Sequence, residues 1–170
     1  MAKKKLILII IAAILALAVL ITGSIILVKN LFKGESKSDS GDFTISIADT
    51  EAKVGDTISV AVSCKGNPGV MAVMGAVKYD SSVLTYKGYK EGSFFSDYMF
   101  NEKDGSVSFN IVENEDVDEN GDMFYLEFEV SGDSSEKTNL ELSIIEGGIC
   151  NFDEELFTPA LKNGTVKINK

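Results

Sequence analysis

The stretch GVMAVMGAVKYDSSVL, Gly69 to Leu84, has the pattern of a β-strand that ends in a turn, but both faces of this strand are apolar. Alternate positions form two sets: Met71, Val73, Val77 and Tyr79 on one face, and Val70, Ala72, Met74 and Ala76 on the other. A strand with one face in the core and one in water alternates apolar with polar residues. The second face is therefore covered by a partner or by this chain itself, or it is apolar by chance.

Short alternating segments separated by Gly, Asn and Asp turns fill the chain from residue 43 onward. Besides the opening stretch, the predicted strands are FTISIA (43–48), ISVAVSC (58–64), SVSFNIV (106–112), MFYLEFEV (123–130), NLELSII (139–145) and GTVKINK (164–170). Their inward positions are Ile58, Val60, Val107, Phe109, Ile111, Phe124, Leu126, Phe128 and Val130. These are enough to fill the space between two sheets, which predicts an all-β fold, a two-sheet β-sandwich. The segment EGSFFSDYMF (91–100) has room for a turn of helix.

Residues 6–28, LILIIIAAILALAVLITGSIILV, form a run of 23 residues without a charge, and lysines precede this run at positions 3–5. At about 1.5 Å per residue such a helix spans the roughly 30 Å of a bilayer core. We predict one transmembrane signal anchor with a cytoplasmic head, residues 1–5, and a flexible linker, residues 29–42, that leads to a domain, residues 43–170. The alternative is a cleaved signal peptide, because ALA at 16–18 resembles a cleavage site.

The expected location follows from this anchor and from the composition. The protein is predicted to cross the cell membrane once, with its C-terminal domain outside the cell, and the all-lysine, cysteine-poor composition suggests a Gram-positive bacterium. From Ser38 onward the chain carries 25 acidic residues and 10 lysines, a net charge near −15. Such a domain repels nucleic acid and anionic surfaces, and it is compatible with calcium or a basic partner.

The chain contains no His, Arg or Trp. Ser–His and Cys–His nucleophile pairs and His-containing metal sites are therefore excluded. An enzyme with two catalytic carboxylates stays open, but no pair stands out among the 26 acidic residues. A carbohydrate-binding module would need a row of exposed aromatics; Tyr86, Tyr89, Tyr98 and Tyr125 are available, but they alternate on no strand. A structural assembly subunit is a further alternative.

Five segments, in order, resemble the cohesin domain, the β-sandwich receptor module of cellulosome scaffolds, from about Phe43 to Ile168. They are VGDTISVAV (54–62), the opening stretch with its Tyr-Asp-x-x-x-Leu ending, SVSFNIVENE (106–115), IIEGGICN (144–151) with its Gly-Gly break, and NGTVKI (163–168). The resemblance implies a jelly roll of about nine strands without catalysis. It also implies that the partners are dockerins, small modules built on paired calcium loops and carried by secreted enzymes that degrade polysaccharides. No cofactor would be required, and any calcium would come mainly with the partner.

The resemblance places the docking surface on the sheet that contains the third, fifth, sixth and eighth strands. The partner-binding residues that it implies are Ala72, Met74, Ala76, Ser108, Asn110, Val112, Glu113 at the edge and Leu156 in a flanking loop. Many cohesins carry Asn and Asp where this chain has Ala72 and Met74, so a more hydrophobic recognition is expected. In the competing interpretation, the aromatic segment 87–105 folds over the outer side of the third strand.

The segment DVDENGDMFYLE, Asp116 to Glu127, matches the calcium-loop pattern D-x-D-x-N-G-x5-E. Glu127 lies inside a predicted strand, about 15 Å beyond Asp122 at about 3.3 Å per residue, too far to close such a loop. A reduced calcium site would use Asp116, Asp118, Asn120 and Asp122. The alternative is an acidic hairpin with an Asn-Gly turn and no metal. Cys64 and Cys150 either form a disulfide or are two buried free thiols.

Overall fold

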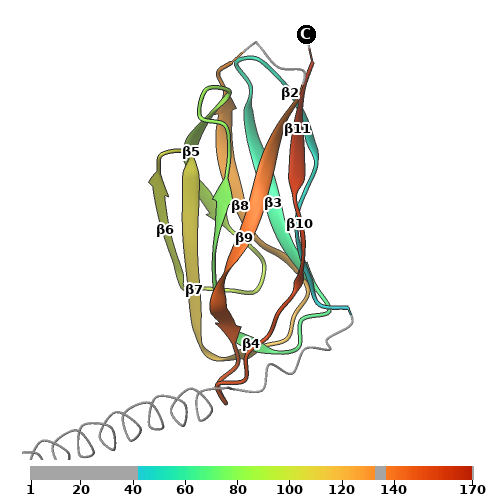
Figure 1. The fold of residues 1–170 in the computed structure, drawn as a ribbon, viewed down its shortest axis with the longest axis vertical. Helices are drawn as coiled ribbons and strands as arrows, with labels where there is room; N and C mark the ends of the chain where they lie inside the picture. Colours follow the sequence, from blue (N-terminus) through green and yellow to red (C-terminus); the bar gives the residue numbers. More distant parts are fainter. Residues whose placement is uncertain (1–41, 133–136, 170) are drawn as a thin grey trace, which may run out of the picture. The chain divides into compact units, whose positions relative to one another are not determined.

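The computed structural model describes residues 42–132 and 137–169, and every helix or strand element in them is a β-strand (Figure 1). The first sheet has the strand order β10 (Ala160–Lys162), β1 (Thr44–Ile47), β3 (Thr57–Lys65), β8 (Gly121–Val130) and β5 (Leu84–Glu91). The second sheet has the order β2 (Thr50–Lys53), β11 (Gly164–Asn169), β9 (Lys137–Cys150), β4 (Val70–Lys78), β7 (Ser106–Val117) and β6 (Tyr98–Lys103).

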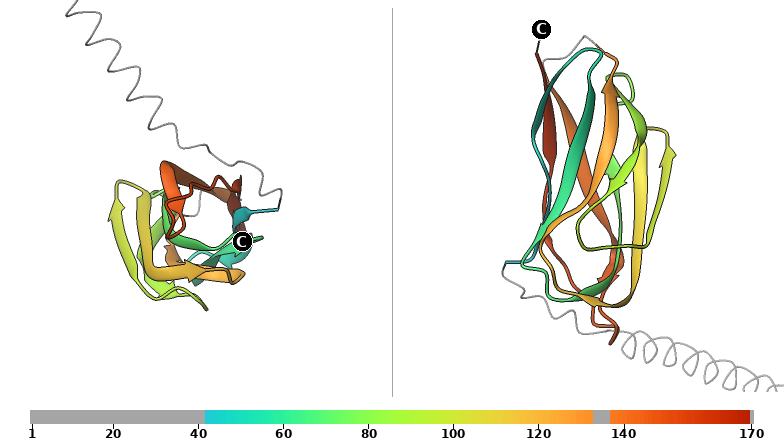
Figure 2. Two further views of the ribbon diagram at one scale, coloured as in Figure 1. Left: turned by 90° about the horizontal axis from the view of Figure 1, so that it is seen from below. Right: turned by 180° about the vertical axis from the view of Figure 1, so that it is seen from behind.

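The two sheets face each other across one apolar core. The left view of Figure 2 shows the two sheets end-on. All nine residues predicted to point inward are buried in this core. Phe124 on β8 links the sheets, because its ring centroid lies 5.0 Å from that of Phe109 on β7 and 5.1 Å from that of Phe100 on β6. The predicted all-β, two-sheet sandwich is thus confirmed.

Within residues 42–132 and 137–169 the sandwich has eleven strands rather than about nine. One additional strand is β2, which was not predicted: the chain crosses between the sheets at Ala48 and Asp49, so that β1 pairs with β3 in the first sheet and β2 pairs with β11 in the second. The Asp49 side chain fixes this crossing by accepting hydrogen bonds of 2.8 Å from the backbone N and the Oγ1 of Thr165. The short β10 adds a strand beside β1.

The expectation of a helical turn at residues 91–100 is wrong. Tyr98 begins strand β6, and its hydroxyl accepts a hydrogen bond from the Gly92 backbone N (3.2 Å) and lies 2.8 Å from the Met123 carbonyl oxygen. Phe95 between them is buried. These contacts pull the segment toward β8 in an irregular path that leaves no room for a helix.

The two faces of β4 are assigned correctly from Ala72 onward but not at Val70 and Met71. Val70 is 1% exposed and belongs to the core, whereas Met71 is only partly buried and does not, the reverse of the prediction. A bulge causes the exchange, because the partners on β7 jump from Val117 opposite Val70 to Val112 opposite Ala72. Such an irregularity reverses which side chains face the core.

None of the described residues belongs to a helix that is long and apolar enough to cross a membrane. The predicted head, anchor and nearly all of the linker, residues 1–41, lie outside the described residues. The anchor therefore stays a prediction from the sequence.

Candidate functional site

Four strands of the second sheet, β9, β4, β7 and β6, present a continuous outer surface, called the β4 face below. Residues paired across neighbouring strands share one side of a sheet, so the printed register groups the side chains of this face into three rows. The first row contains Asn101, Ser108, Ala76 and Ser143; the second contains Met99, Asn110 and Met74; the third contains Val112, Ala72, Cys150 and Leu156. All the predicted partner-binding residues except Glu113 lie in these rows.

The first row of the β4 face is polar, with Asn101, Ser108 and Ser143 exposed, whereas large apolar side chains are exposed in and beside the other two rows. Met99 is 64% exposed, Val112 41% and Leu156 37%, and Ile145 in the adjoining part of β9 is 60% exposed. Large apolar side chains that cluster on one surface are typical of a protein interface. The third and second rows therefore have the composition of a binding surface.

The Gly-Gly break in β9 places Ile145 beside the second row. The β4–β9 register shifts between the pairs Gly75–Ile144 and Val73–Ile149, so that the intervening residues bulge out of the ladder. A side chain at Gly148 would begin 2.8 Å from the carbonyl oxygen of Met74. Only glycine allows this close approach of the two backbones, which explains why the break sits at this position.

Asn110 is a polar residue in the middle of the second row, between Met99 and Met74. Its Oδ1 is buried and accepts no hydrogen bond from the described part of the chain. A buried acceptor without a donor costs about 1–3 kcal/mol. The centre of the β4 face thus holds an acceptor for which the described residues supply no donor.

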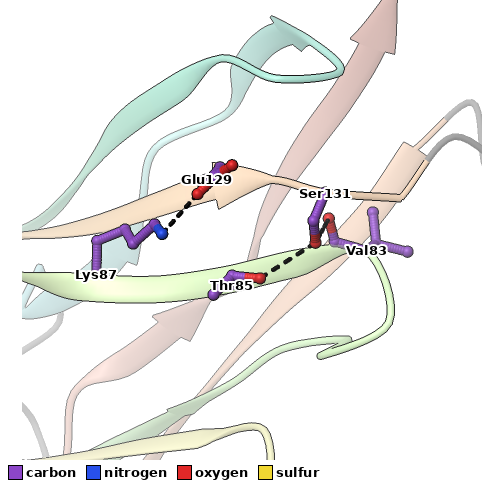
Figure 3. A network of polar contacts seen from close by, with 5 residues as sticks. All are labelled: Val83, Thr85, Lys87, Glu129 and Ser131. Carbon is purple, nitrogen blue, oxygen red and sulfur yellow. Dashed lines mark hydrogen bonds and ion pairs between the residues drawn. The ribbon is translucent and has the colours of Figure 1, made fainter.

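The outer side of the first sheet differs sharply from the β4 face. There Lys87 pairs with Glu129, and Thr85 lies 3.2 Å from the Ser131 hydroxyl (Figure 3). Lys90 pairs with Glu127 on the same two strands. Among the described residues the remaining ion pair, Lys167 with Glu51, joins β11 and β2. Exposed ion pairs of this kind add little stability but mark a surface that faces water. None of the ion pairs in the described ranges lies on the β4 face.

Glu113, predicted to meet the partner at the edge of this surface, already has donors within its own chain. One carboxylate oxygen accepts hydrogen bonds from the backbone N of Ser96 and, at 3.2 Å, of Asp97, and the other accepts one of 2.8 Å from the Ser96 hydroxyl. Desolvation raises the pKa of Glu113, but these hydrogen bonds outweigh it and hold the pKa below its ordinary value. The carboxylate therefore fastens the β5–β6 loop to β7 beside Val112.

Replacing Glu113 with Gln should lower the free energy of unfolding by about 1 kcal/mol, because charged hydrogen bonds become neutral ones. Since the pKa in the folded state is lowered, the stability from this carboxylate is complete above its ordinary pKa and is lost as the pH falls from there through the lowered pKa of the folded state. Urea unfolding across that range should show a smaller loss of stability for Glu113→Gln than for the unaltered chain. Parallel pH profiles would contradict this assignment.

The competing interpretation, in which segment 87–105 covers the outer side of β4, is wrong. This segment forms part of β5 and all of β6, at the edges of the two sheets. Its aromatic rings lie elsewhere: Phe95 is buried in the core, and Tyr89, which is 39% exposed on β5, stacks on Phe100 of β6 with ring centroids 4.1 Å apart. Segment 87–105 therefore leaves the β4 face open.

A family model described as "Cohesin domain" matches residues 43–168. The chain belongs to the cohesin family. Members are non-catalytic binding modules, which agrees with the prediction that this chain is not an enzyme. The β4 face is built from the strands on which the family resemblance places the docking surface.

Several solved cohesin structures are similar to this chain. The cohesin in the Coh-OlpA-Doc918 cohesin–dockerin complex of Clostridium thermocellum has 26% identity and a TM-score of 0.69, and the match covers 75% of this chain and 99% of that one. A non-cellulosomal cohesin of Archaeoglobus fulgidus has 23% identity, 76% and 92% coverage, and a TM-score of 0.69. The cohesin of the Coh-OlpC-Doc435 complex, also of C. thermocellum, has 20% identity, 75% and 94% coverage, and a TM-score of 0.68. The latter two support the fold alone. A search of the curated proteins finds no match.

Several residues of this cohesin's β4 face were missed from the sequence: Met99, Asn101, Ser143, Ile145 and Cys150. Met99 and Asn101 lie on β6, which was considered as a helical turn. If Tyr98 to Lys103 had been interpreted as a strand, both residues would have been found. Tyr98 and Phe100 would then face the core side, and Met99 and Asn101 would alternate with them on the outer side. Ile145 could not be found, since the bulge that exposes it depends on the packing of β9 against β4.

The acidic segment from Asp116 joins β7 to β8 as a hydrogen-bonded hairpin. Asp116 Oδ1 accepts a hydrogen bond from the Phe152 backbone N (2.7 Å), Asn120 Oδ1 accepts one from Asn67 N (3.0 Å), and Asp122 Oδ1 accepts one from the Ser63 hydroxyl (2.6 Å). In the described residues no group of three or more His, Cys, Asp or Glu side chains could hold a metal ion. The geometry thus gives no support to the calcium site predicted at Asp116, Asp118, Asn120 and Asp122.

The two cysteines are free. Cys64 faces the core from β3, and Cys150 lies on the β4 face of the other sheet, partly buried. The predicted alternative of a disulfide is therefore wrong, and the expectation of two buried thiols holds for Cys64 alone. Burial raises the pKa of the Cys64 thiol to about 11.

Proposed function

We propose that this chain is a cell-surface receptor that captures dockerin-bearing secreted proteins, chiefly polysaccharide-degrading enzymes, on its β4 face. The observation that carries the proposal is the open, apolar and unpaired surface of Met99, Met74, Val112 and Leu156 in a cohesin domain. A similar cohesin at 26% identity was solved in a complex with a dockerin, which supports the same partner class here.

The β4 face favours a partner that is itself apolar at its centre. Most polar side chains of its rows lie in the first row, and in the other two rows Ala72 and Met74 offer none of the hydrogen-bonding groups of Asn or Asp. The Oδ1 of Asn110 would be satisfied by a hydroxyl or amide donor from the partner, if Met74 and Met99 shift to admit it. Hydrophobic contact with one central hydrogen bond is thus the proposed mode of recognition.

The anchoring half of the proposal rests on the sequence. A charge-free run at 6–28 after a lysine-rich head is long enough to cross a bilayer. Acting as a single-pass anchor, it would hold the cohesin domain outside the cell, where secreted enzymes are found. We propose that captured enzymes are displayed at the membrane in this way.

Direct binding of polysaccharide was the alternative, and no feature of the described residues favours it. Of the five tyrosines, only Tyr89 is exposed, at 39%, and its ring stacks on Phe100. A flat row of exposed rings, which such binding would need, is not found on the described strands. Contact with polysaccharide is therefore proposed to be indirect, through the captured enzymes.

The test uses the full chain, solubilised in mild detergent, and the dockerin modules encoded in the same genome, each produced as a fusion. Binding is measured with calcium and with a chelator, with the OlpA cohesin and Doc918 as a positive control. Because dockerins are built on paired calcium loops, at least one module should bind when calcium is present, and this binding should be lost when the chelator is added. If no module binds while the control pair does, the proposed function is wrong.

A further inference from the structure

The turn between β9 and β10 presents a large aromatic side chain to solvent. Phe152 in this turn is 64% exposed. The turn closes through Asn151, whose backbone N donates to the Glu155 carbonyl (3.2 Å) and whose Oδ1 accepts from Glu155 N (2.8 Å). It is also tied to β7, because Phe152 N donates to Asp116 Oδ1 (2.7 Å). Phe152 is thus held in the exposed position by backbone contacts rather than by packing of its ring.

This turn lies at the end of the third row of the β4 face. Cys150 belongs to that row, and the chain returns to pair with it at Leu156 after the turn. The turn is part of the lowest coloured segment in Figure 1, where β9 ends. The apolar surface of the β4 face therefore continues from Val112 through Leu156 toward Phe152.

The surroundings of Phe152 are acidic. Asp153, Glu154 and Glu155 follow it and are exposed, and Asp116 contacts its backbone. None of these four carboxylates is in an ion pair within the described residues, whose ion pairs all involve other strands. Desolvation is the largest cause of the raised pKa of the nearby Cys150 thiol, and the negative charges of Glu154 and Asp116 raise this pKa further. The negative charge around Phe152 is thus uncompensated.

We propose that Phe152 is an anchor residue of the β4 face and that its partner receives it in an apolar pocket bordered by lysine or arginine side chains. This inference rests on the proposed function and specifies the partner's surface. Aromatic residues, Phe included, are enriched at protein interfaces, and a side chain on a rigid support loses less conformational entropy on binding. A second copy of this chain does not fit, because its own acidic turn and net charge near −15 from Ser38 onward would be repelled.

The first arm of the test compares Phe152→Ala with Leu161→Ala in binding the dockerin modules that the unaltered full chain captures. Leu161 is 40% exposed on β10 and serves as the matched control. Phe152→Ala should weaken affinity roughly 30-fold, and Leu161→Ala by less than about twofold. Circular dichroism should show the same thermal unfolding for Phe152→Ala as for the unaltered chain, since the turn's contacts are made by its backbone.

The second arm tests the charge. The double change Asp153→Asn with Glu154→Gln should slow association roughly threefold to tenfold at low salt, and the difference should vanish near 1 M salt. The control is Asp104→Asn with Glu141→Gln, which removes the same charge near the opposite ends of β7 and β9 and should have little effect.

The outcomes separate the two proposals. If the unaltered chain binds dockerins and Phe152→Ala binds equally well, the anchor role is wrong while the proposed function stands. If no dockerin binds, both fail. Self-association can be measured by analytical ultracentrifugation. If the unaltered chain self-associates and Phe152→Ala does not, Phe152 binds a second copy of the chain, and the proposal of a basic partner is wrong.

Discussion

Met74→Asp should abolish most of the binding of dockerin modules, with a loss of affinity of about 100-fold or more. Met74 lies in the second row of the β4 face, beside Asn110 and near the bulge that carries Ile145. Burying a methionine under a partner contributes roughly 1.5–3 kcal/mol. The variant loses this term and also buries a carboxylate without a partner, which adds a further cost. Isothermal titration calorimetry with the captured dockerin would measure the change.

The matched control for this variant is Val54→Asp. Val54 is 49% exposed in the turn between β2 and β3, away from the β4 face. Val54→Asp makes the same kind of change as Met74→Asp, from an apolar side chain to a carboxylate. It should leave the affinity for the dockerin unchanged within about twofold. Equal affinities for Met74→Asp and the unaltered chain would place the binding surface elsewhere on the domain.

Phe124→Ala should have the largest effect on stability, a loss of about 3–5 kcal/mol in the free energy of unfolding. Phe124 is fully buried, and its ring contacts Phe100 and Phe109 at centroid distances of 5.1 and 5.0 Å. Alanine would leave a cavity between β8 and the strands β6 and β7. The outer sides of β6 and β7 form part of the β4 face. Urea unfolding followed by circular dichroism measures the loss.

Two comparisons show whether that loss comes from the core. Phe124→Leu keeps an apolar side chain in place and should cost less than half as much. Phe152→Ala removes the same side chain from an exposed turn and should change stability by no more than about 0.5 kcal/mol. If Phe124→Ala unfolded at the same urea concentration as the unaltered chain, the described packing between the two sheets would be wrong.

The sequence was sufficient for the fold class because strand alternation depends on the sequence alone. Val107, Phe109 and Ile111 alternate with Ser108 and Asn110, and the structure puts each on the expected side of β7. The same rule failed where strands pair irregularly. Val70 reaches the core because of a bulge in the pairing of β4 with β7. The sequence of β4 alone does not show how many extra residues β7 inserts at this point.

The candidate site was predicted in its middle and missed at its edges. Ala72, Met74 and Ala76 follow from the apolar second face of one strand. Glu113 was expected to meet the partner, but in the structure its carboxylate binds the β5–β6 loop through Ser96, a contact that the sequence pattern did not indicate. Phe152 was missed because exposure of an aromatic side chain results from how its turn is held, not from the residue type.

The most direct test of the central claim, that the β4 face binds dockerins, is NMR of the full chain with 13C-labelled methionine methyl groups. Met74 and Met99 lie on this face, whereas Met123 is 1% exposed in the core and is an internal control. Adding a captured dockerin with calcium should shift or broaden the Met74 and Met99 signals and leave the Met123 signal unchanged. Binding that leaves both the Met74 and Met99 signals unaltered would contradict the claim.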